Sequence, residues 1–137
     1  ARACYPRSGV LRGGGHIFAI RNRDCSYRMP KKAIRVATKM AIASRLRDGG
    51  IVVIDKLDFE QPRTKDMAAI LQALNLAGKA TLVTTAAYDV NVFKSARNIQ
   101  KVSVSPASDL NALSVLKPKC LLVTKDALDV MRAKLSA

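Results

Sequence analysis

The chain divides near residue 50 into two parts with different patterns of apolar and polar positions. From residue 51 onward, short apolar runs alternate with segments in which apolar residues recur every three or four positions. The runs predict strands and the recurring segments predict amphipathic helices. The expected strands are Ile51–Asp55, Thr81–Thr84, Val102–Val104 and Leu121–Thr124, and the expected helices are Thr64–Leu76, Asp89–Asn98, Asp109–Leu116 and Lys125–Leu135.

Strands that alternate with helices favour right-handed crossovers and parallel pairing. The expected fold class is therefore α/β, a three-layer sandwich with a mainly parallel sheet of about four strands. Because Ile51 to Ile54 is apolar without interruption, we expect this strand to be covered on both faces. Asp89, Asp109 and Asp126 lie where helices should begin, so we expect them to cap helix N-termini.

A further helix is expected from Pro30 to Asp48, since proline suits a first helical turn and Gly49-Gly50 stops the helix. On a helical projection, cations fall on one arc and apolar residues on the opposite arc. We expect the first arc to contact RNA and the second to pack against the domain. The cations are Lys31, Lys32, Arg35, Lys39 and Arg45, and the apolar residues are Ala33, Val36, Ala37, Met40 and Ala41.

Residues 1–29 are expected to form an extended basic N-terminal arm, and residues 30–137 a globular α/β domain. Residues 1–12 show neither helical nor strand periodicity, and His16 to Ile20 is typical of a short strand or an extended run. The first 28 residues hold six arginines and no lysine, interleaved with glycines and aromatic residues. A guanidinium can hold a phosphate bidentately and stack on a base, so this composition favours an RNA-binding arm over a flexible solvated tail.

The net charge points to a polyanionic partner. The 137 residues carry 24 lysines and arginines against 10 acidic residues, a net charge of +14. Residues 1–50 hold 12 basic and 2 acidic side chains, whereas residues 51–137 hold 12 basic and 8 acidic ones. A surface this positive gains free energy by releasing counterions from nucleic acid. The hydrophobic fraction of 49% is too high for a wholly disordered basic tail.

Several classes of site are disfavoured. Three widely spaced cysteines and a single histidine, His16, fit neither a disulfide framework nor a zinc site, so we expect no metal. Gly13-Gly14-Gly15 lacks the preceding strand and following helix of a dinucleotide site, so a sharp bend or a close approach to RNA explains it better. No apolar run is long enough to cross a membrane. We expect no cofactor and no membrane partner.

The carboxyl ends of the strands, where α/β enzymes commonly bind ligands, carry hydroxyl and carboxyl groups but no histidine to act as a base. No glycine-rich turn follows any expected strand, and no acid cluster suits a divalent metal. We therefore expect no catalytic residue. The side chains considered are Asp55, Asp58, Thr84, Thr85, Ser105, Thr124 and Asp126.

Five stretches spread along the chain form a recognisable combination. They are Arg12-Gly13-Gly14-Gly15 with Ile17-Phe18, the basic and aromatic linker Arg23 to Lys32, Gln61 to Lys65, Ser95 to Asn98, and Val102 to Val104. In order and spacing they resemble the bacterial-type ribosomal protein four family of the large subunit, although no single motif would suffice. The run His16 to Ile20 departs from the commoner Val-Val-Phe-Gly-Pro of that family.

The resemblance implies a structural constituent of the large subunit, in the cytoplasmic ribosome of a bacterium or, alternatively, of an organelle. It implies large-subunit ribosomal RNA and neighbouring ribosomal proteins as partners, and no homo-oligomer. In this family a globular domain lies on the solvent side, and a long basic loop enters the RNA and lines the nascent-peptide exit tunnel. On this comparison the chain begins within that loop, at Ala1 and Arg2, without the outgoing half of the loop or the first strand and helix.

The candidate RNA contacts combine the arm, the first helix and the family-like motifs. They are Arg2, Arg7, Arg12, Gly13, Gly14, Gly15, Arg21, Arg23, Tyr27, Arg28, Lys31, Lys32, Arg35, Lys39, Arg63, Lys65, Arg97 and Asn98. Two other functions stay open at this point. An RNA-modifying enzyme would need a cofactor pocket, and a free-standing regulator would bind a compact RNA or DNA target without a ribosome.

Overall fold

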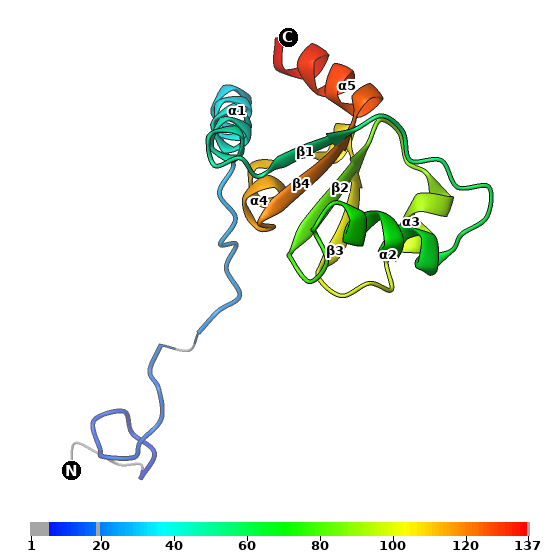
Figure 1. Ribbon diagram of the computed structural model, residues 1–137. Coiled ribbons are helices and arrows are strands. Elements are labelled where there is room, and N and C mark those ends of the chain that lie inside the picture. Colours follow the sequence, from blue (N-terminus) through cyan, green and yellow to red (C-terminus); the bar gives the residue numbers. More distant parts are fainter. Residues whose placement is uncertain (1–5, 19, 137) are drawn as a thin grey trace.

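The computed structural model describes residues 6–18 and 20–136 (Figure 1). Within them, helices cover both faces of a four-stranded sheet. The helices are α1 (Lys31–Arg47), α2 (Thr64–Ala73), α3 (Val90–Ala96), the 3-10 helix η1 (Ala107–Asp109), α4 (Ala112–Leu116) and α5 (Lys125–Ser136). The strands are β1 (Ile51–Ile54), β2 (Thr81–Thr85), β3 (Val102–Pro106) and β4 (Cys120–Thr124). The predicted helices and strands from residue 30 onward are all present, with ends that shift by a few residues.

The sheet has the strand order β1-β4-β2-β3, and every pairing in it is parallel. β4 pairs Leu121 with Ile51 of β1, and Thr81 of β2 pairs with Cys120 on one side and with Val102 of β3 on the other. The last strand in the chain therefore lies in the middle of the sheet. The expectation of an α/β fold with a mainly parallel sheet of about four strands is confirmed.

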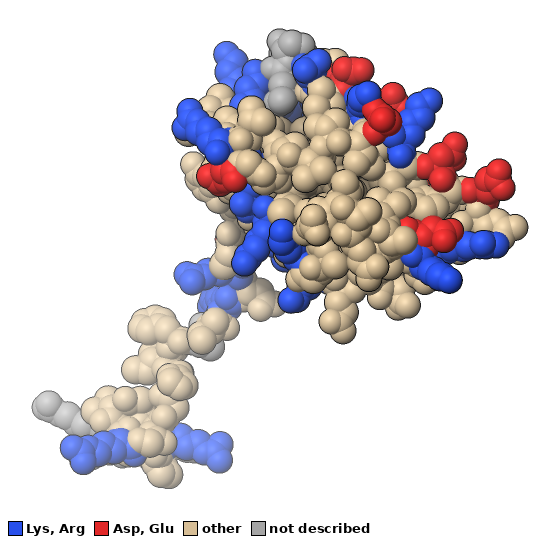
Figure 2. Space-filling model, in the orientation of Figure 1, with Lys and Arg blue, Asp and Glu red and all other residues tan. Residues whose placement is uncertain are grey.

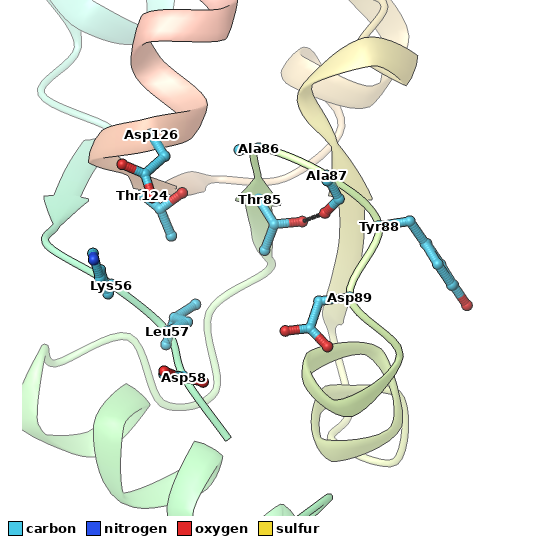
Figure 3. Close-up of a pocket in the computed structure, with 10 residues that line it drawn as sticks. All are labelled: Lys56, Leu57, Asp58, Thr85, Ala86, Ala87, Tyr88, Asp89, Thr124 and Asp126. Atoms are coloured by element: carbon cyan, nitrogen blue, oxygen red, sulfur yellow. Dashed lines mark hydrogen bonds between the residues drawn. The ribbon is translucent and has the colours of Figure 1, made fainter. Parts of the chain in front are cut away.

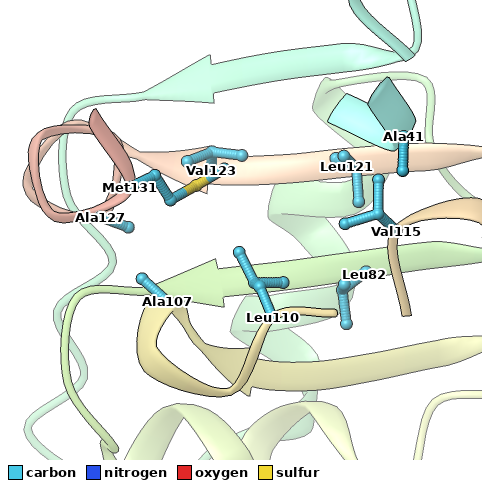
Figure 4. Close-up of a cluster of buried hydrophobic side chains, with 9 residues drawn as sticks. All are labelled: Ala41, Leu82, Ala107, Leu110, Val115, Leu121, Val123, Ala127 and Met131. Atoms are coloured by element: carbon cyan, nitrogen blue, oxygen red, sulfur yellow. The ribbon is translucent and has the colours of Figure 1, made fainter. Parts of the chain in front are cut away.

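Alternation along the central strands divides the core into two layers. Leu82, Leu121 and Val123 point to one face, where they pack with buried residues of α1, α4 and α5 (Figure 4). Val83 and Leu122 point to the other face, where α2 and α3 cover them. Successive strand residues face opposite sides of a sheet, so one apolar run supplies both cores. The three-layer sandwich is thus confirmed.

β1 is less buried than its sequence suggests. It lies at an edge of the sheet, and the Val53 side chain is 47% exposed. Ile51 packs against the core beside α1, and Val52 and Ile54 pack against the core beside α2. Both faces of this strand thus contact the core, as predicted, but coverage is incomplete at Val53 because β1 lies at the edge of the sheet.

Two of the three predicted helix caps are wrong. Asp89 does cap α3, since its carboxylate accepts a hydrogen bond from the backbone N–H of Asn91 at 2.8 Å. Asp109 instead ends η1, and Asn111 caps α4 by accepting from the N–H of Ser114 at 2.8 Å. At α5, the hydroxyl of Thr124 accepts from the N–H of Ala127, and Asp126 sits within the first turn. The shift of one or two residues matters because only the last non-helical residue has a side chain aimed at the free N–H groups.

The described residues before α1 contain turns but no helix or strand. The N–H of Gly15 donates to the carbonyl of Arg7 at 2.7 Å, which folds the segment between them into a compact bend. Gly13 has a φ of +75°, and a Cβ on Gly14 would lie 1.9 Å from the carbonyl oxygen of Ser8. A side chain is therefore strained at Gly13 and excluded at Gly14, and a sharp bend accounts for both glycines. The run His16 to Ile20 forms no strand where it is described, and Ala19 lies outside the described residues.

Candidate nucleic-acid interface

Four cations form a stripe along α1. Lys31, Lys32, Arg35 and Lys39 are exposed, and they lie beside the face on which Ala41 is buried. Residues three and four apart are neighbours on a helix surface, so these charges form a continuous strip over about two turns. Neither of the two ion pairs among the described residues involves them. Their charge is available to an anion.

The packed face of α1 is rotated relative to the prediction. Ala41 is buried and Ala37 is half-buried, but Ala33 is exposed, Val36 is 54% exposed and Met40 is 67% exposed. The contacts with the domain are made instead by the side of the helix that carries Thr38, Ala41, Ile42 and Arg45. Apolar residues follow two adjacent stripes on α1, and periodicity alone does not say which of the two meets the sheet.

Arg45 does not belong to the cationic stripe. Its Nε donates to the carbonyl of Val115 at 3.2 Å, and its guanidinium also donates to the carbonyl of Leu116. These carbonyls end α4, where the partial negative charge of the helix attracts a cation. Arg45 therefore fastens α1 to α4, and the prediction that it shares an RNA-facing arc with the other four cations is wrong.

In the arm, the predicted contacts are solvent-exposed along the described residues. Arg7, Arg12, Arg21, Arg23, Tyr27 and Arg28 are exposed, as are Gly13 and Gly15, whereas Gly14 is half-buried. Arg2 lies outside the described residues. The Tyr27 side chain is 86% exposed and that of Phe18 is 92% exposed, so aromatic rings stand uncovered among the arginines. Solvent-exposed aromatic rings and guanidinium groups can stack on unpaired bases.

The one acid in the described arm is engaged locally. Asp24 accepts hydrogen bonds from the backbone N–H and the hydroxyl of Ser26, at 2.8 and 2.9 Å. These two bonds, the backbone one foremost, hold the pKa of Asp24 below its ordinary value. The carboxylate is thus satisfied within its own turn, and no ion pair ties it to a neighbouring arginine among the described residues.

The remaining predicted contacts lie in two other places. Arg63 and Lys65 lie where the segment after β1 enters α2, and the N–H of Arg63 donates to the hydroxyl of Ser95 at 3.0 Å. Arg63 shares a surface pocket with Asp58, Glu60 and Asp66. Arg97 and Asn98 are exposed and follow α3, in the segment that leads into β3. The hydrogen bond to Ser95 brings the start of α2 beside the end of α3, so these two pairs lie near each other, on the face of the sheet opposite to α1.

Sequence reasoning missed a group of cations that directly precede the strands. They are Arg47, Lys79, Lys101, Lys117 and Lys119, and all five are exposed. Figure 2 shows several lysines and arginines on the side of the domain nearest the arm, where few acidic residues are in view, whereas on the far side acidic and basic residues are mixed. The sequence contains a basic residue shortly before each predicted strand. Because parallel strands all begin at the same edge of a sheet, these residues could have been predicted to lie together at that edge.

The opposite edge, at the carboxyl ends of the strands, has an open pocket of about 280 Å³ (Figure 3). Three of the polar side chains that line it have structural partners. The hydroxyl of Thr85 donates to the carbonyl of Ala87 at 2.7 Å, Thr124 caps α5, and Asp89 caps α3. Asp55 forms an ion pair with Lys125, whose hydrogen bond and charge hold the pKa of Asp55 below its ordinary value. Among the described residues, no group of three or more metal-ligating side chains is present.

Nothing in the described part of the chain is a helix both long and apolar enough to cross a bilayer.

Comparison with known proteins places the chain in one family. A model of the ribosomal protein L4/L1 family matches residues 1–134. The large ribosomal subunit protein uL4 of Rhodopirellula baltica is 51% identical over 129 residues, which cover 94% of this chain and 58% of that protein. The protein of the same name from Moorella thermoacetica is 48% identical over 127 residues, which cover 93% of this chain and 61% of that protein. The chain thus spans about three fifths of the length of these relatives.

The resemblance found in the motifs is confirmed over nearly the whole length of the chain. The exposed cations of α1 and the arginine-rich segment before it lie within the matched region. From its sequence and its relatives, the chain belongs to the ribosomal protein L4/L1 family.

Proposed function

We propose that this chain is a structural constituent of the large ribosomal subunit and binds large-subunit ribosomal RNA. The observation that carries the proposal is the set of exposed cations on the arm and on α1, which no acidic side chain of the described residues neutralises. The names of the relatives, large ribosomal subunit proteins, support the same function. No catalytic step is part of the proposal, and the polar groups at the carboxyl edge act in caps and in an ion pair.

The proposed mechanism is electrostatic and architectural. The arginines of residues 1–29 neutralise phosphates that the folding of the RNA brings together, and each can hold a phosphate through two parallel hydrogen bonds. The α1 stripe of Lys31, Lys32, Arg35 and Lys39 continues this contact onto the domain of residues 30–137. Tyr27 stacks on an unpaired base, and the bend at Gly13-Gly14-Gly15 lets the backbone approach the RNA closely. The domain holds these groups in position.

The finer parts of the proposal follow from the resemblance to the family. The arm lines the nascent-peptide exit tunnel, the domain contacts neighbouring ribosomal proteins, and the chain acts as a single copy per subunit. The predicted contacts Arg63, Lys65, Arg97 and Asn98 touch RNA where the start of α2 meets the end of α3. The relatives compared above support a bacterial ribosome in the cytoplasm, with an organellar one as the alternative.

Cosedimentation with large subunits, followed by crosslink mapping, tests this function. We expect the chain to travel with the large subunit and the arm to crosslink to ribosomal RNA. Binding to a large-subunit RNA transcript should weaken steeply with salt, as expected if roughly 6–10 phosphates are neutralised. A binding constant that is flat between low and moderate salt would contradict the proposal. Binding of a compact RNA or DNA without ribosome association would indicate a free-standing regulator, and binding of a methyl donor would indicate a modifying enzyme.

A further inference from the structure

The parallel sheet brings five cations from distant parts of the chain to one edge. Arg47 precedes β1, Lys79 precedes β2, Lys101 precedes β3, and Lys117 and Lys119 precede β4. We call this group the amino edge. Backbone hydrogen bonds join its segments, from Thr81 N–H to the Lys101 carbonyl at 2.9 Å and from Lys119 N–H to the Ala80 carbonyl at 2.8 Å. The charges are therefore held side by side by the sheet itself.

The amino edge is exposed and almost free of acidic residues. All five of its cations are exposed, and neither ion pair among the described residues involves them. In the segments between each helix and the strand that follows it, Asp48 is the one acid. Six carboxylates instead follow the carboxyl ends of the strands, at Asp55, Asp58, Glu60, Asp89, Asp109 and Asp126. Cations are also present at that edge, at Lys56, Arg63, Lys65 and Lys125, so the acidic residues, not the cations, are the ones concentrated at one end of the strands.

Compensation of helix dipoles explains only part of this arrangement. Each helix between two strands ends at the amino edge, where cations interact favourably with its C-terminal turn. That accounts for Arg47, in the last turn of α1, and for Lys117, at the C-cap of α4. The effect falls off beyond the last turn. Lys79 and Lys101 lie several residues after the ends of α2 and α3, at Ala73 and Ala96, so a helix dipole gives no reason for them.

The backbone at Lys101 supports a role outside the fold. Its φ is +64°, in the left-handed region that glycine and asparagine adopt most readily. A lysine in this conformation costs roughly 1 kcal/mol relative to a residue suited to it. Its ammonium makes a long contact, 3.4 Å, with the carbonyl of Gly78, which offers little stabilisation in return. The position carries a positive charge at the expense of local stability.

The dimensions and chemistry of the amino edge fit a nucleic-acid backbone. Neighbouring strands lie about 4.8 Å apart, so the four strand starts extend over roughly 14 Å. Each strand of a double helix carries one charge per ~3.4 Å of axis, so several phosphates face this width. The edge is mostly lysine, a compact charge that suits phosphate contacts of any sequence, whereas the described arm carries arginine alone. Arg97 and Asn98 begin the segment that ends at Lys101.

We propose that the amino edge is a second RNA-binding surface, which holds the sugar-phosphate backbone without reading its sequence. This rests on the proposed function and adds to it a contact that neither the arm nor the α1 stripe supplies. The arm would then position the chain through stacking and bidentate contacts, and the edge would fix the orientation of the domain on the RNA.

The test compares Lys79→Gln/Lys101→Gln/Lys119→Gln with the unchanged chain, using a transcript of the Rhodopirellula baltica large-subunit ribosomal RNA as the probe. We expect the slope of log K against log salt to fall in magnitude by about 2–3, and the affinity at 0.1 M salt to fall on the order of 100-fold. The control is Lys56→Gln/Arg132→Gln, which removes two charges from exposed positions outside the amino edge. It should change the slope by less than about 1.

The possible results distinguish failure of this inference from failure of the proposed function. If the unchanged chain does not bind the transcript, the proposed function fails. If it binds and the edge variant behaves like the control, the amino edge is not an RNA surface, while the proposed function stands. Acetylation of the unchanged chain serves as a check that needs no variant to fold. Bound transcript should protect Lys79, Lys101 and Lys119 but not Lys56, and equal labelling of Lys56 and the three edge lysines would overturn the inference.

Discussion

Arg45 on α1 donates a hydrogen bond from Nε to the carbonyl of Val115 on α4, at 3.2 Å. A second bond reaches the carbonyl of Leu116. One guanidinium thus satisfies two carbonyls at the end of a short helix and joins segments far apart in the sequence. The cation stabilises the fold, whereas its neighbours along α1 are free, so charge on one helix serves two different purposes.

Replacement of Arg45 by methionine should therefore reduce stability rather than RNA binding. We expect the free energy of unfolding to fall by about 1–3 kcal/mol, because two hydrogen bonds from a charged donor are lost and the α4 carbonyls are left unpaired. Denaturant unfolding and RNA titration measure the two effects. The matched variant Lys39→Met should show the reverse, weaker RNA binding at unchanged stability. A stable Arg45→Met protein that binds RNA poorly would contradict this assignment.

Substitutions on α1 can test which of its faces packs against the domain. Met40→Ser should change the free energy of unfolding by less than about 0.5 kcal/mol, since this side chain is largely exposed. Ala41→Leu should destabilise by about 1–3 kcal/mol, because extra methylene groups at a buried position force their neighbours apart. Equal sensitivity at the two positions, measured by urea unfolding, would mean that Met40 also packs.

Charge reversal in the arm should separate binding from folding. For Arg21→Glu/Arg23→Glu/Arg28→Glu we expect RNA binding to be lost and the melting temperature to stay within about 2 °C, because these side chains are exposed and make no ion pair in the described structure. Thermal unfolding by circular dichroism and RNA titration provide the readouts. Loss of structure together with binding would show that these residues belong to the core.

Lys101→Asn should weaken RNA binding and increase the free energy of unfolding. Asparagine adopts a positive φ more readily than lysine, so we expect a gain of a few tenths to about 1 kcal/mol in the free energy of unfolding. The lost charge should lower the magnitude of the salt slope of RNA binding by about 0.7–0.9. Lys79→Asn is the control for the charge alone, since the positive-φ residues of the structure do not include Lys79. A less stable Lys101→Asn protein would show that the lysine stabilises its own turn.

The ion pair between Asp55 and Lys125 predicts an acid-dependent effect. Lys125 holds the pKa of Asp55 below its ordinary value, and Asp55 raises that of Lys125. A carboxyl whose pKa is lowered by folding adds stability above its unfolded pKa, and that stability disappears as the pH falls through the folded pKa. The difference in melting temperature between the unchanged chain and Lys125→Gln should thus be present at neutral pH and vanish well below about pH 4. A difference that persists in acid would mean that Lys125 acts through packing.

Much of the fold could be read from the sequence because buried strands and amphipathic helices have different apolar periods. Val83 and Leu122, for example, belong to runs that are apolar on both faces, and both are fully buried. The sequence predicts burial less well where it depends on which strands and helices lie beside a residue. Val53 has the same chemistry as Val83 but lies on an edge strand, so it is exposed.

The candidate interface was anticipated only where charges cluster along the sequence. The α1 stripe is local, and helical periodicity places Lys31, Lys32, Arg35 and Lys39 together. The amino edge brings Arg47, Lys79 and Lys119 together only after the sheet forms. Local patterns cannot place Arg45 either, because its carbonyl partners at Val115 and Leu116 are known only when α1 and α4 are in contact.

β4, at residues 120–124, lies between β1 and β2 and pairs with both. Among the described strands β1 pairs with β4 alone, so the sheet depends on contacts between distant parts of the chain. The arm, in contrast, precedes the domain and needs no strand partner to present its arginines. If the arm binds RNA as proposed, that attachment does not require a complete sheet, and the domain can fold on a chain whose arm is already tethered.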